Sequence, residues 1–243
     1  MEFTFESYKN LVKLLKEKGY EIVSYNNIDS VDKGVVMRHD VDFDLEKALE
    51  MAKIENEIGI SSTYFVLLTS NFYNVFSKKS KDSILKLQSL GHEIGLHYDE
   101  EAYVCDSIED IKEKIKYEID ILSNILGNPV ESISMHRPSK MILERNIEFE
   151  NVVNSYSKKY FEAIKYVSDS RMKWREDVIR LIEKDQYDKF QILTHPFWYS
   201  KNDEDIKSKF VKFFKLKSSK MYEELDKNFS NIQDVIIRSD VKW

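Results

Sequence analysis

The feature that most constrains the fold is an apolar run that ends abruptly in ionisable side chains. Residues 34–42 read GVVMRHDVD, so a strand-like segment leads directly into a histidine and two carboxylates. Residues 93–97, 132–136 and 191–195 repeat this format, because each is an apolar segment that ends in histidine. In parallel α/β proteins, ligands and catalytic groups gather at the carboxyl ends of strands. The chain therefore predicts one site at which strands distant in sequence converge.

Composition and charge narrow the class of protein. At 243 residues with 42% hydrophobic residues, the chain is long enough for one α/β barrel or two smaller domains. Only six glycines and three prolines occur, which argues against a long flexible linker, and we expect a single domain over residues 1–243. Lysines and acids are mixed at a net charge of −6, which argues against a nucleic-acid partner. We interpret the lysine-rich stretch 207–220 as a solvated helix face.

Three observations bear on location. Cys105 is the only cysteine, so no intramolecular disulfide can form and a reducing compartment is expected. Residues 1–6 carry acids and lack the apolar core of a signal peptide. No apolar run reaches the roughly 18 residues that a membrane-spanning helix needs. We therefore expect a cytoplasmic protein with no membrane span.

Strand-like and helix-like segments alternate along the chain. Strands are expected over residues 20–25, 34–40, 63–68, 93–96, 133–135, 151–154, 163–167, 190–194 and 235–237. Helices are expected over residues 7–18, 45–58, 81–90, 107–126, 177–184 and 204–227. Asp44 and Ser107 are expected to cap two of these helices. This alternation, without short hairpin signals, predicts a mostly parallel sheet or barrel.

The ordered motifs resemble those of the polysaccharide deacetylases, the NodB-homology group of carbohydrate esterases. The first motif corresponds to residues 38–42 (RHDVD), where Val41 separates the family's paired aspartates, as in divergent intracellular members. The second, third and fifth motifs correspond to residues 91–97 (GHEIGLH), 136–139 (HRPS) and 193–195 (LTH). The fourth is matched loosely by Asp169 and Trp174. The resemblance covers about Gly34 to Pro196 and implies a distorted (β/α) barrel.

The resemblance also implies a divalent metal and a general base. Asp42 and His97 are the expected metal ligands, and either Glu101 or His39 is the third, because Glu101 stands where the family has a second histidine. Zinc is the expected metal, with cobalt, nickel and manganese as alternatives. Asp40 is assigned as the general base, because the family places its base before its ligand. The inserted Val41 leaves open which of the two aspartates has which role.

Two further residues have roles implied by the family. His195 is expected to be the general acid that protonates the leaving amine, which suits a side chain whose pKa lies near working pH. Its structural alternative is a hydrogen bond to a backbone carbonyl. Arg137 resembles the family arginine that orients the base, and its alternative is an arginine–carboxylate bridge without a catalytic part.

The remaining candidates concern substrate contact. His136 could be a ligand or a substrate contact, and Trp174 could line the pocket or fill a gap in the core. Trp198 belongs to the aromatic run 197–199, which is typical of a wall on which a sugar stacks. His92 stands at the start of a predicted strand, the end away from the site, and is interpreted as structural.

The resemblance implies a metal-dependent hydrolase that removes an acetyl group from an N-acetylated or O-acetylated sugar. We expect the substrate to be nucleotide-linked or lipid-linked, on the way to a surface polysaccharide. One alternative is a different metal hydrolase on the same scaffold, a glycosidase or a phosphoesterase, because a fold does not determine a reaction. Another is a sugar-binding descendant that has lost catalysis. The sequence leaves the oligomeric state open.

Overall fold

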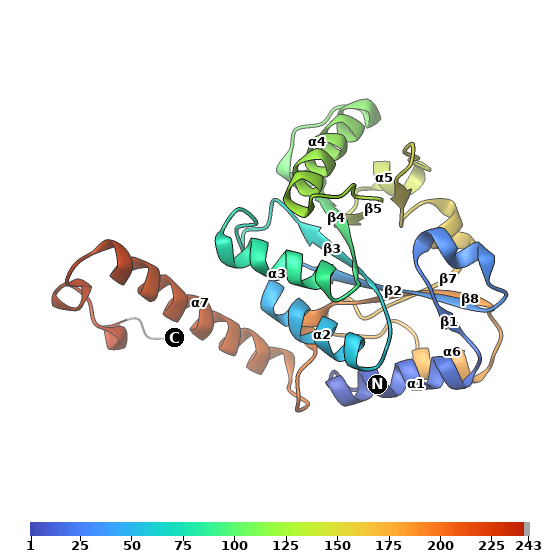
Figure 1. Cartoon of the computed structure of the whole chain (residues 1–243), viewed down its shortest axis with the longest axis horizontal. Coiled ribbons are helices and arrows are strands. Elements are labelled where there is room, and N and C mark those ends of the chain that lie inside the picture. The colour runs from blue at the N-terminus through green and yellow to red at the C-terminus, as the bar shows by residue number, and fades with distance from the viewer. Residues whose placement is uncertain (241–243) are drawn as a thin grey trace. The chain divides into compact units, whose positions relative to one another are not determined.

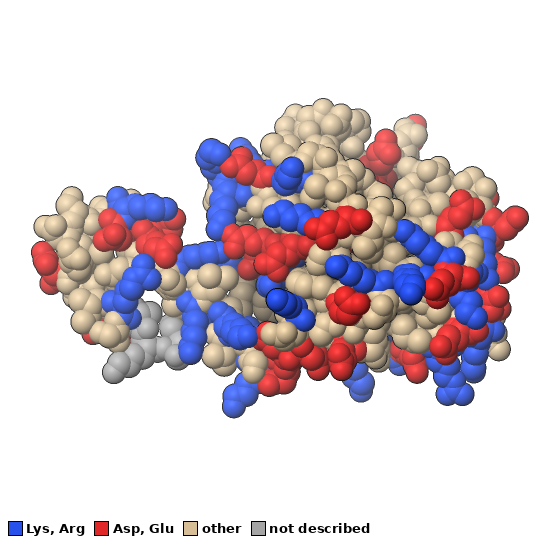
Figure 2. Space-filling view, turned by 60° about the horizontal axis from the view of Figure 1, so that its bottom comes forward, with Lys and Arg blue, Asp and Glu red and all other residues tan. Residues whose placement is uncertain are grey.

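The computed structural model describes residues 1–240 and separates the chain into two compact units, Met1–Lys201 and Asn202–Trp243 (Figure 1). In the described part of the second unit, the long helix α7 (Ile206–Asn228) is followed by two short 3₁₀ helices, Ile232–Asp234 and Arg238–Asp240. Among the described residues, none forms a helix with the length and apolarity that crossing a bilayer requires. Figure 2 shows lysine and arginine intermixed with aspartate and glutamate over one face.

The first unit is built on eight parallel strands. They are β1 (Glu21–Ile22), β2 (Gly34–Val41), β3 (Thr63–Leu67), β4 (Glu93–Asp99), β5 (Ser132–His136), β6 (Val153–Asn154), β7 (Lys165–Ser168) and β8 (Lys189–Thr194). Their order is β6-β5-β4-β3-β2-β8-β7, with β1 paired to β2. The sheet curls into the predicted distorted (β/α) barrel, and no pairing between β6 and β7 closes it within residues 1–240. Strand β2 lies near the middle of the order and is buried along its whole length.

Helices alternate with these strands and begin where the sequence provides caps. They are α1 (Phe5–Glu17), α2 (Leu45–Glu57), α3 (Lys78–Ser89), α4 (Ile108–Leu126), α5 (Lys140–Glu144) and α6 (Val178–Glu183). The side chain of Asp44 accepts a hydrogen bond from the Glu46 backbone N–H at 2.8 Å, which confirms the predicted cap of α2. Ser107 forms a reciprocal capping box with Asp110 at the start of α4.

Two predicted strands differ from the structure. Only Glu21–Ile22 of the segment 20–25 pairs with β2, and a 3₁₀ helix begins at Tyr25. The strand predicted over residues 235–237 is wrong, because this segment lies between two 3₁₀ helices and makes no ladder. Three apolar branched residues in a row are not sufficient for a strand, since strand stability depends on a neighbouring strand to pair with.

His92 has the structural role that the sequence predicted. Its Nδ1 accepts a hydrogen bond from the Ser62 backbone N–H at 3.2 Å, and its Nε2 lies 3.0 Å from the carbonyl oxygen of Ala52. The imidazole therefore ties the start of β4 to helix α2 and to the residue before β3.

A buried carboxylate joins α1, α2, β2 and β3. Glu55 of α2 accepts hydrogen bonds from the hydroxyls of Tyr8, Ser62 and Tyr64, and His39 Nε2 lies 2.9 Å from its Oε1. Burial alone would raise the pKa of Glu55, but the charge and hydrogen bond of His39 and the other donors lower it to about 2. The carboxylate is therefore ionised, and its hydrogen-bond partners come from α1, β2, β3 and the residue before β3.

We predict that Glu55→Gln lowers the free energy of unfolding by about 3 kcal/mol, because a neutral amide cannot accept all of these hydrogen bonds. The pKa of about 2 lies below the ordinary value of 4.5. The stabilisation is thus present above about pH 4.5 and is lost as the pH falls toward 2. Urea unfolding at several pH values measures both effects. Glu57→Gln on the exposed face of α2 is the control, and equal stability of the two variants would contradict the prediction.

Candidate functional site

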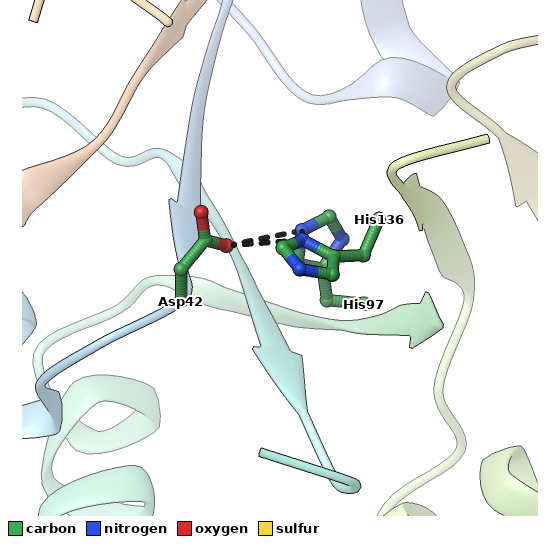
Figure 3. A group of neighbouring side chains, drawn as sticks. All are labelled: Asp42, His97 and His136. Carbon is green, nitrogen blue, oxygen red and sulfur yellow. Dashed lines mark hydrogen bonds and ion pairs between the residues drawn. The ribbon is translucent and has the colours of Figure 1, made fainter. Parts of the chain in front are cut away.

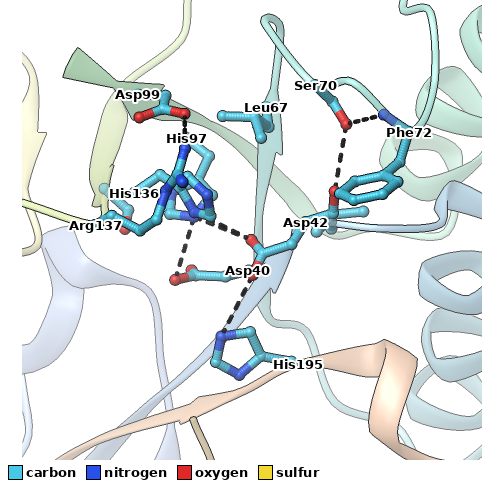
Figure 4. Close-up of polar contacts among 12 residues, drawn as sticks. Asp40, Asp42, Leu67, Ser70, Phe72, His97, Asp99, His136, Arg137 and His195 are labelled. Atoms are coloured by element: carbon cyan, nitrogen blue, oxygen red, sulfur yellow. Dashed lines mark hydrogen bonds and ion pairs between the residues drawn. The ribbon is translucent and has the colours of Figure 1, made fainter. Parts of the chain in front are cut away.

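Four strand ends bring the candidate residues together at the carboxyl edge of the barrel. Asp40 lies in β2 and Asp42 directly follows it, His97 lies near the end of β4, His136 ends β5, and His195 follows β8. Figure 4 shows the two aspartates with the imidazoles of His97 and His136 on one side and that of His195 on the other. Because all of these strands are parallel, their carboxyl ends meet at one edge.

Asp42, His97 and His136 form a compact group of potential metal ligands (Figure 3). Asp42 Oδ1 lies 3.2 Å from His97 Nε2 and 3.5 Å from His136 Nδ1, and the two nitrogens are 3.2 Å apart. Although Asp42 Oδ1 is buried, it has no hydrogen-bond partner of good geometry. Two imidazole nitrogens and one carboxylate oxygen that converge in this way match the donor set of catalytic zinc sites.

The charges of the histidines act on Asp42. Burial alone would raise the pKa of Asp42, but the adjacent His97 and the charge of His195 hold it well below the usual range. Burial and the charge of His97 lower the pKa of His136. An ionised carboxylate beside a neutral imidazole is the protonation state in which both can bind a cation.

The structure does not bring Glu101 or His39, the two expected alternatives for the third ligand, into this group. Glu101 is exposed beyond the end of β4 and pairs with Arg137, with 3.0 Å between Oε2 and Nη2. His39 lies on the other face of β2, where its Nδ1 is 2.7 Å from Thr194 Oγ1 and its Nε2 faces Glu55. Successive residues of a strand point to opposite faces, so His39 cannot share the site with its neighbour Asp40.

Asp40, the expected base, is held by a buried arginine. Arg38 donates from Nε to Asp40 Oδ1 at 2.9 Å and from Nη2 to Oδ2 at 2.8 Å. The guanidinium is fully buried, contacts Ser134 and lies about equally far from the rings of Phe65 and Tyr156, at 5.2 and 5.1 Å. Burial alone would raise the pKa of Asp40, but the charge of Arg38 holds it below the usual value.

Arg137, expected from the resemblance to orient the base, does not contact Asp40. Its Nη2 donates to Asp99 Oδ2 at 2.7 Å and also pairs with Glu101, and its side chain is 57% exposed. The alternative interpretation, an arginine–carboxylate bridge, describes this geometry. Sequence reasoning missed Arg38, although it stands two residues before Asp40, on the same face of the strand. An arginine in a buried strand needs a carboxylate partner, and this signal could have identified it.

His195 is oriented by a second buried carboxylate. Its Nδ1 lies 2.6 Å from Asp169 Oδ1, and its backbone N–H donates to both oxygens of Asp169 at 3.1 and 3.2 Å. Burial alone would lower the pKa of His195, but the charge and hydrogen bond of Asp169 raise it to about 9. The imidazole is therefore protonated at neutral pH, and its Nε2 lies 3.8 Å from Asp42 Oδ2. Asp169 is the residue that only loosely matched the fourth motif.

Aromatic residues surround His195 on one side. The ring of Trp198 is 6.3 Å from that of His195 and 5.8 Å from that of Phe43, but Trp198 is only 4% exposed. Phe72 packs on Phe43 at 5.0 Å and is 43% exposed, so it is the accessible ring of this group. Trp174 is half-buried in the loop after β7, and its Nε1 has no hydrogen-bond partner.

Comparison with known proteins finds similarity to solved structures only: no family model and no curated protein matches this sequence. IcaB from Ammonifex degensii is 15% identical with a TM-score of 0.41, over 54% of this chain and 65% of that chain. BA3943, a carbohydrate esterase family 4 pseudoenzyme from Bacillus anthracis, is 13% identical with a TM-score of 0.45, over 76% and 64%. The chitin deacetylase from the fungal pathogen Colletotrichum lindemuthianum is 13% identical with a TM-score of 0.42, over 75% and 81%.

The chain thus spans just under two thirds of the length of IcaB and BA3943. At such low identities and TM-scores, the likeness carries no conclusion about activity, and the three proteins include a pseudoenzyme as well as a deacetylase.

Proposed function

We propose that the protein is a metal-dependent hydrolase that removes the acetyl group from an acetylated sugar, with all of its catalytic residues in the unit Met1–Lys201. The proposal rests on how the ligands, the base and the acid are placed relative to one another. An Asp–His–His donor set has a buried carboxylate base, Asp40, and a protonated imidazole, His195, beside it.

Asp42, His97 and His136 would hold the metal, with zinc favoured by the donor set and cobalt, nickel or manganese as alternatives. A divalent ion bound there supplies a water of lowered pKa and polarises the acetyl carbonyl. The unpartnered Asp42 Oδ1 and the two facing imidazole nitrogens are the features of this chain that fit such an ion.

The protein groups then have separate tasks. Asp40, held ionised by Arg38, accepts the proton of the attacking water as the oxygen–carbon bond forms. His195, held protonated by Asp169, donates the proton from Nε2 to the leaving nitrogen as the carbon–nitrogen bond breaks. The products are a free amine and acetic acid, which ionises to acetate on release, and the proton that Asp40 accepts balances the one that His195 donates.

This division of tasks distinguishes the proposal from its alternatives. A glycosidase of the usual kind uses two carboxyl groups, one of them as the acid, on the two sides of a glycosidic bond. Here the acid is an imidazole, and its raised pKa of about 9 keeps it protonated at neutral pH. A non-catalytic descendant would not need Asp40 and His195 held by two separate buried partners, Arg38 and Asp169. A cytoplasmic location and a part in surface-polysaccharide synthesis stay predictions.

Metal binding is the first test. We predict that protein purified without chelator contains about one divalent ion per chain, and that Asp42→Asn, His97→Gln and His136→Gln each lose it. Glu101→Gln is the matched control and retains the ion, because Glu101 pairs with Arg137 instead. Elemental analysis and titration calorimetry with zinc measure this. Loss of the ion in Glu101→Gln but not in His136→Gln would contradict the assignment of the third ligand.

Catalysis is the second test. We predict that Asp40→Asn, His195→Gln and Asp169→Asn lower kcat for acetate release by about 10²- to 10⁴-fold. Metal content remains normal in His195→Gln and Asp169→Asn, because neither residue belongs to the donor set. A panel of acetylated, phosphorylated and glycosidic sugars separates the candidate reactions. Turnover of a glycoside or phosphoester without acetate release would refute the deacetylase proposal.

The third test separates the two arginines. Arg38→Lys removes the two-point contact with Asp40, and we predict that kcat falls roughly 10- to 100-fold. Arg137→Lys should leave kcat within about threefold, since Arg137 pairs with Asp99 and Glu101 and not with Asp40. Thermal unfolding and metal content show whether Arg38→Lys remains folded. The opposite ranking of the two variants would show that Arg137 orients the base.

A further inference from the structure

The loop between β7 and α6, residues 169–177, lies at the edge of the catalytic site and has no role in the proposed mechanism beyond its first residue. That residue, Asp169, holds His195. The loop folds back on the end of its own strand, because the backbone N–H of Lys173 donates to the Asp169 carbonyl and that of Arg175 donates to the Ser168 carbonyl, each at 3.2 Å. The residues between them are thus fixed beside the dyad that delivers the proton.

The backbone of this loop is strained. Arg171 and Met172 are consecutive non-glycine residues with φ angles of 60° and 55°, in the left-handed region that favours glycine. Such conformations cost free energy and persist where the surrounding structure enforces them, often at sites that clamp a ligand. Here the strain lies two residues after Asp169, which positions His195, so the loop is a candidate for substrate recognition.

The inner segment of the loop, residues 170–175, is basic, and the acids Asp169, Glu176 and Asp177 flank it. Arg171, Lys173 and Arg175 are all exposed, and no acid occurs from residue 170 to residue 175, whereas the whole chain has a net charge of −6. Within residues 1–240, no ion pair involves any of these three cations, so their charges are not neutralised by neighbouring carboxylates. Arg137, the other cation at this edge, differs because Asp99 and Glu101 both pair with it.

One of these cations acts on Tyr156, a residue whose ring contacts Arg38. Burial raises the pKa of the Tyr156 phenol, and Arg175 is among the positive charges that oppose this rise. Tyr156 in turn stacks against Arg38, which holds Asp40. The charge of Arg175 thus reaches Tyr156, while the start of the loop lies beside His195.

The loop also contains a buried hydrogen-bond donor, the indole N–H of Trp174. Trp174 stands between Lys173 and Arg175, and its Nε1–H is buried without an acceptor. A buried donor that lacks an acceptor costs free energy unless a ligand or water satisfies it. An anion with several oxygens would satisfy this N–H and the neighbouring guanidinium groups together, and arginine binds phosphate oxygens in a two-point geometry.

We propose that residues 170–175 form a phosphate-binding loop, and that the substrate is an acetylated sugar linked to a phosphate or diphosphate. This inference rests on the proposed deacetylation and names the substrate class of that same site. Three cations and an indole N–H in one short loop fit a diphosphate better than a single carboxylate. The diphosphate could carry a nucleoside or a polyprenyl chain, because the loop recognises the group common to both.

The test compares acetate release from four substrates: UDP-N-acetylglucosamine, N-acetylglucosamine 1-phosphate, a short-chain polyprenyl diphosphate N-acetylglucosamine and neutral methyl N-acetylglucosaminide. The variant Arg171→Gln/Arg175→Gln should raise KM for the phosphorylated substrates roughly tenfold or more, with kcat little changed. KM for the neutral glycoside should stay within about twofold. Arg180→Gln, an exposed arginine on α6, is the matched control and should change neither. Added salt should raise KM for phosphorylated substrates only.

The outcomes distinguish a failure of phosphate recognition from a failure of the proposed deacetylation. Equal turnover of neutral and phosphorylated substrates by the wild-type protein, or equal effects of the double variant on both, would overturn phosphate recognition and leave deacetylation standing. If no substrate releases acetate, the proposed function fails. Titration calorimetry with UDP-N-acetylglucosamine then tests the loop by itself, because binding that the double variant loses supports it and absence of binding overturns it. Preference for the nucleoside or the polyprenyl substrate identifies the source of the diphosphate.

Discussion

The buried ion pair between Arg38 and Asp40 is the interaction on which the arrangement of the site depends. Removing one partner of such a pair leaves an unpaired charge in the core, which costs several kcal/mol, so both residues must stay in place together. The pair lies on one face of β2, and His39 between them faces Glu55 on the other side. The central strand thus carries a catalytic carboxylate on one face and part of a structural network on the opposite face.

The site then divides into two halves that meet at Asp42. On one side, β4 and β5 contribute His97 and His136, whose nitrogens converge on the same carboxylate oxygen. On the other side, β7 and β8 contribute the dyad of Asp169 and His195. Asp169 also begins the basic loop, so one strand end both sets the protonation of the acid and positions the residues that we assign to phosphate. The proposed phosphate-binding residues therefore follow directly in the chain from the residue that orients the acid.

The sequence predicted the helices and strands well, but it predicted the contacts between their side chains less well. The apolar runs that end in histidine predicted the strands and their shared edge, and Asp44 and Ser107 marked helix starts correctly. The exclusion of His39 follows from strand alternation alone, whereas placing His136 in the donor set required a contact with a residue far along the chain. The family motif pointed to Glu101 and Arg137, which lie next to one another at the rim and pair together instead.

By itself, the sequence determined the strand–helix alternation and the placement of ionisable residues at strand ends, because both follow from local periodicity and from chain direction. Only the tertiary structure decided which imidazole completes the donor set and which carboxylates pair with Arg137. Those choices depend on register between strands: β4 and β5 pair so that Asp99 lies opposite His136, which brings that imidazole beside His97. A period of two residues along a strand specifies a face, but it does not specify the register of the neighbouring strand.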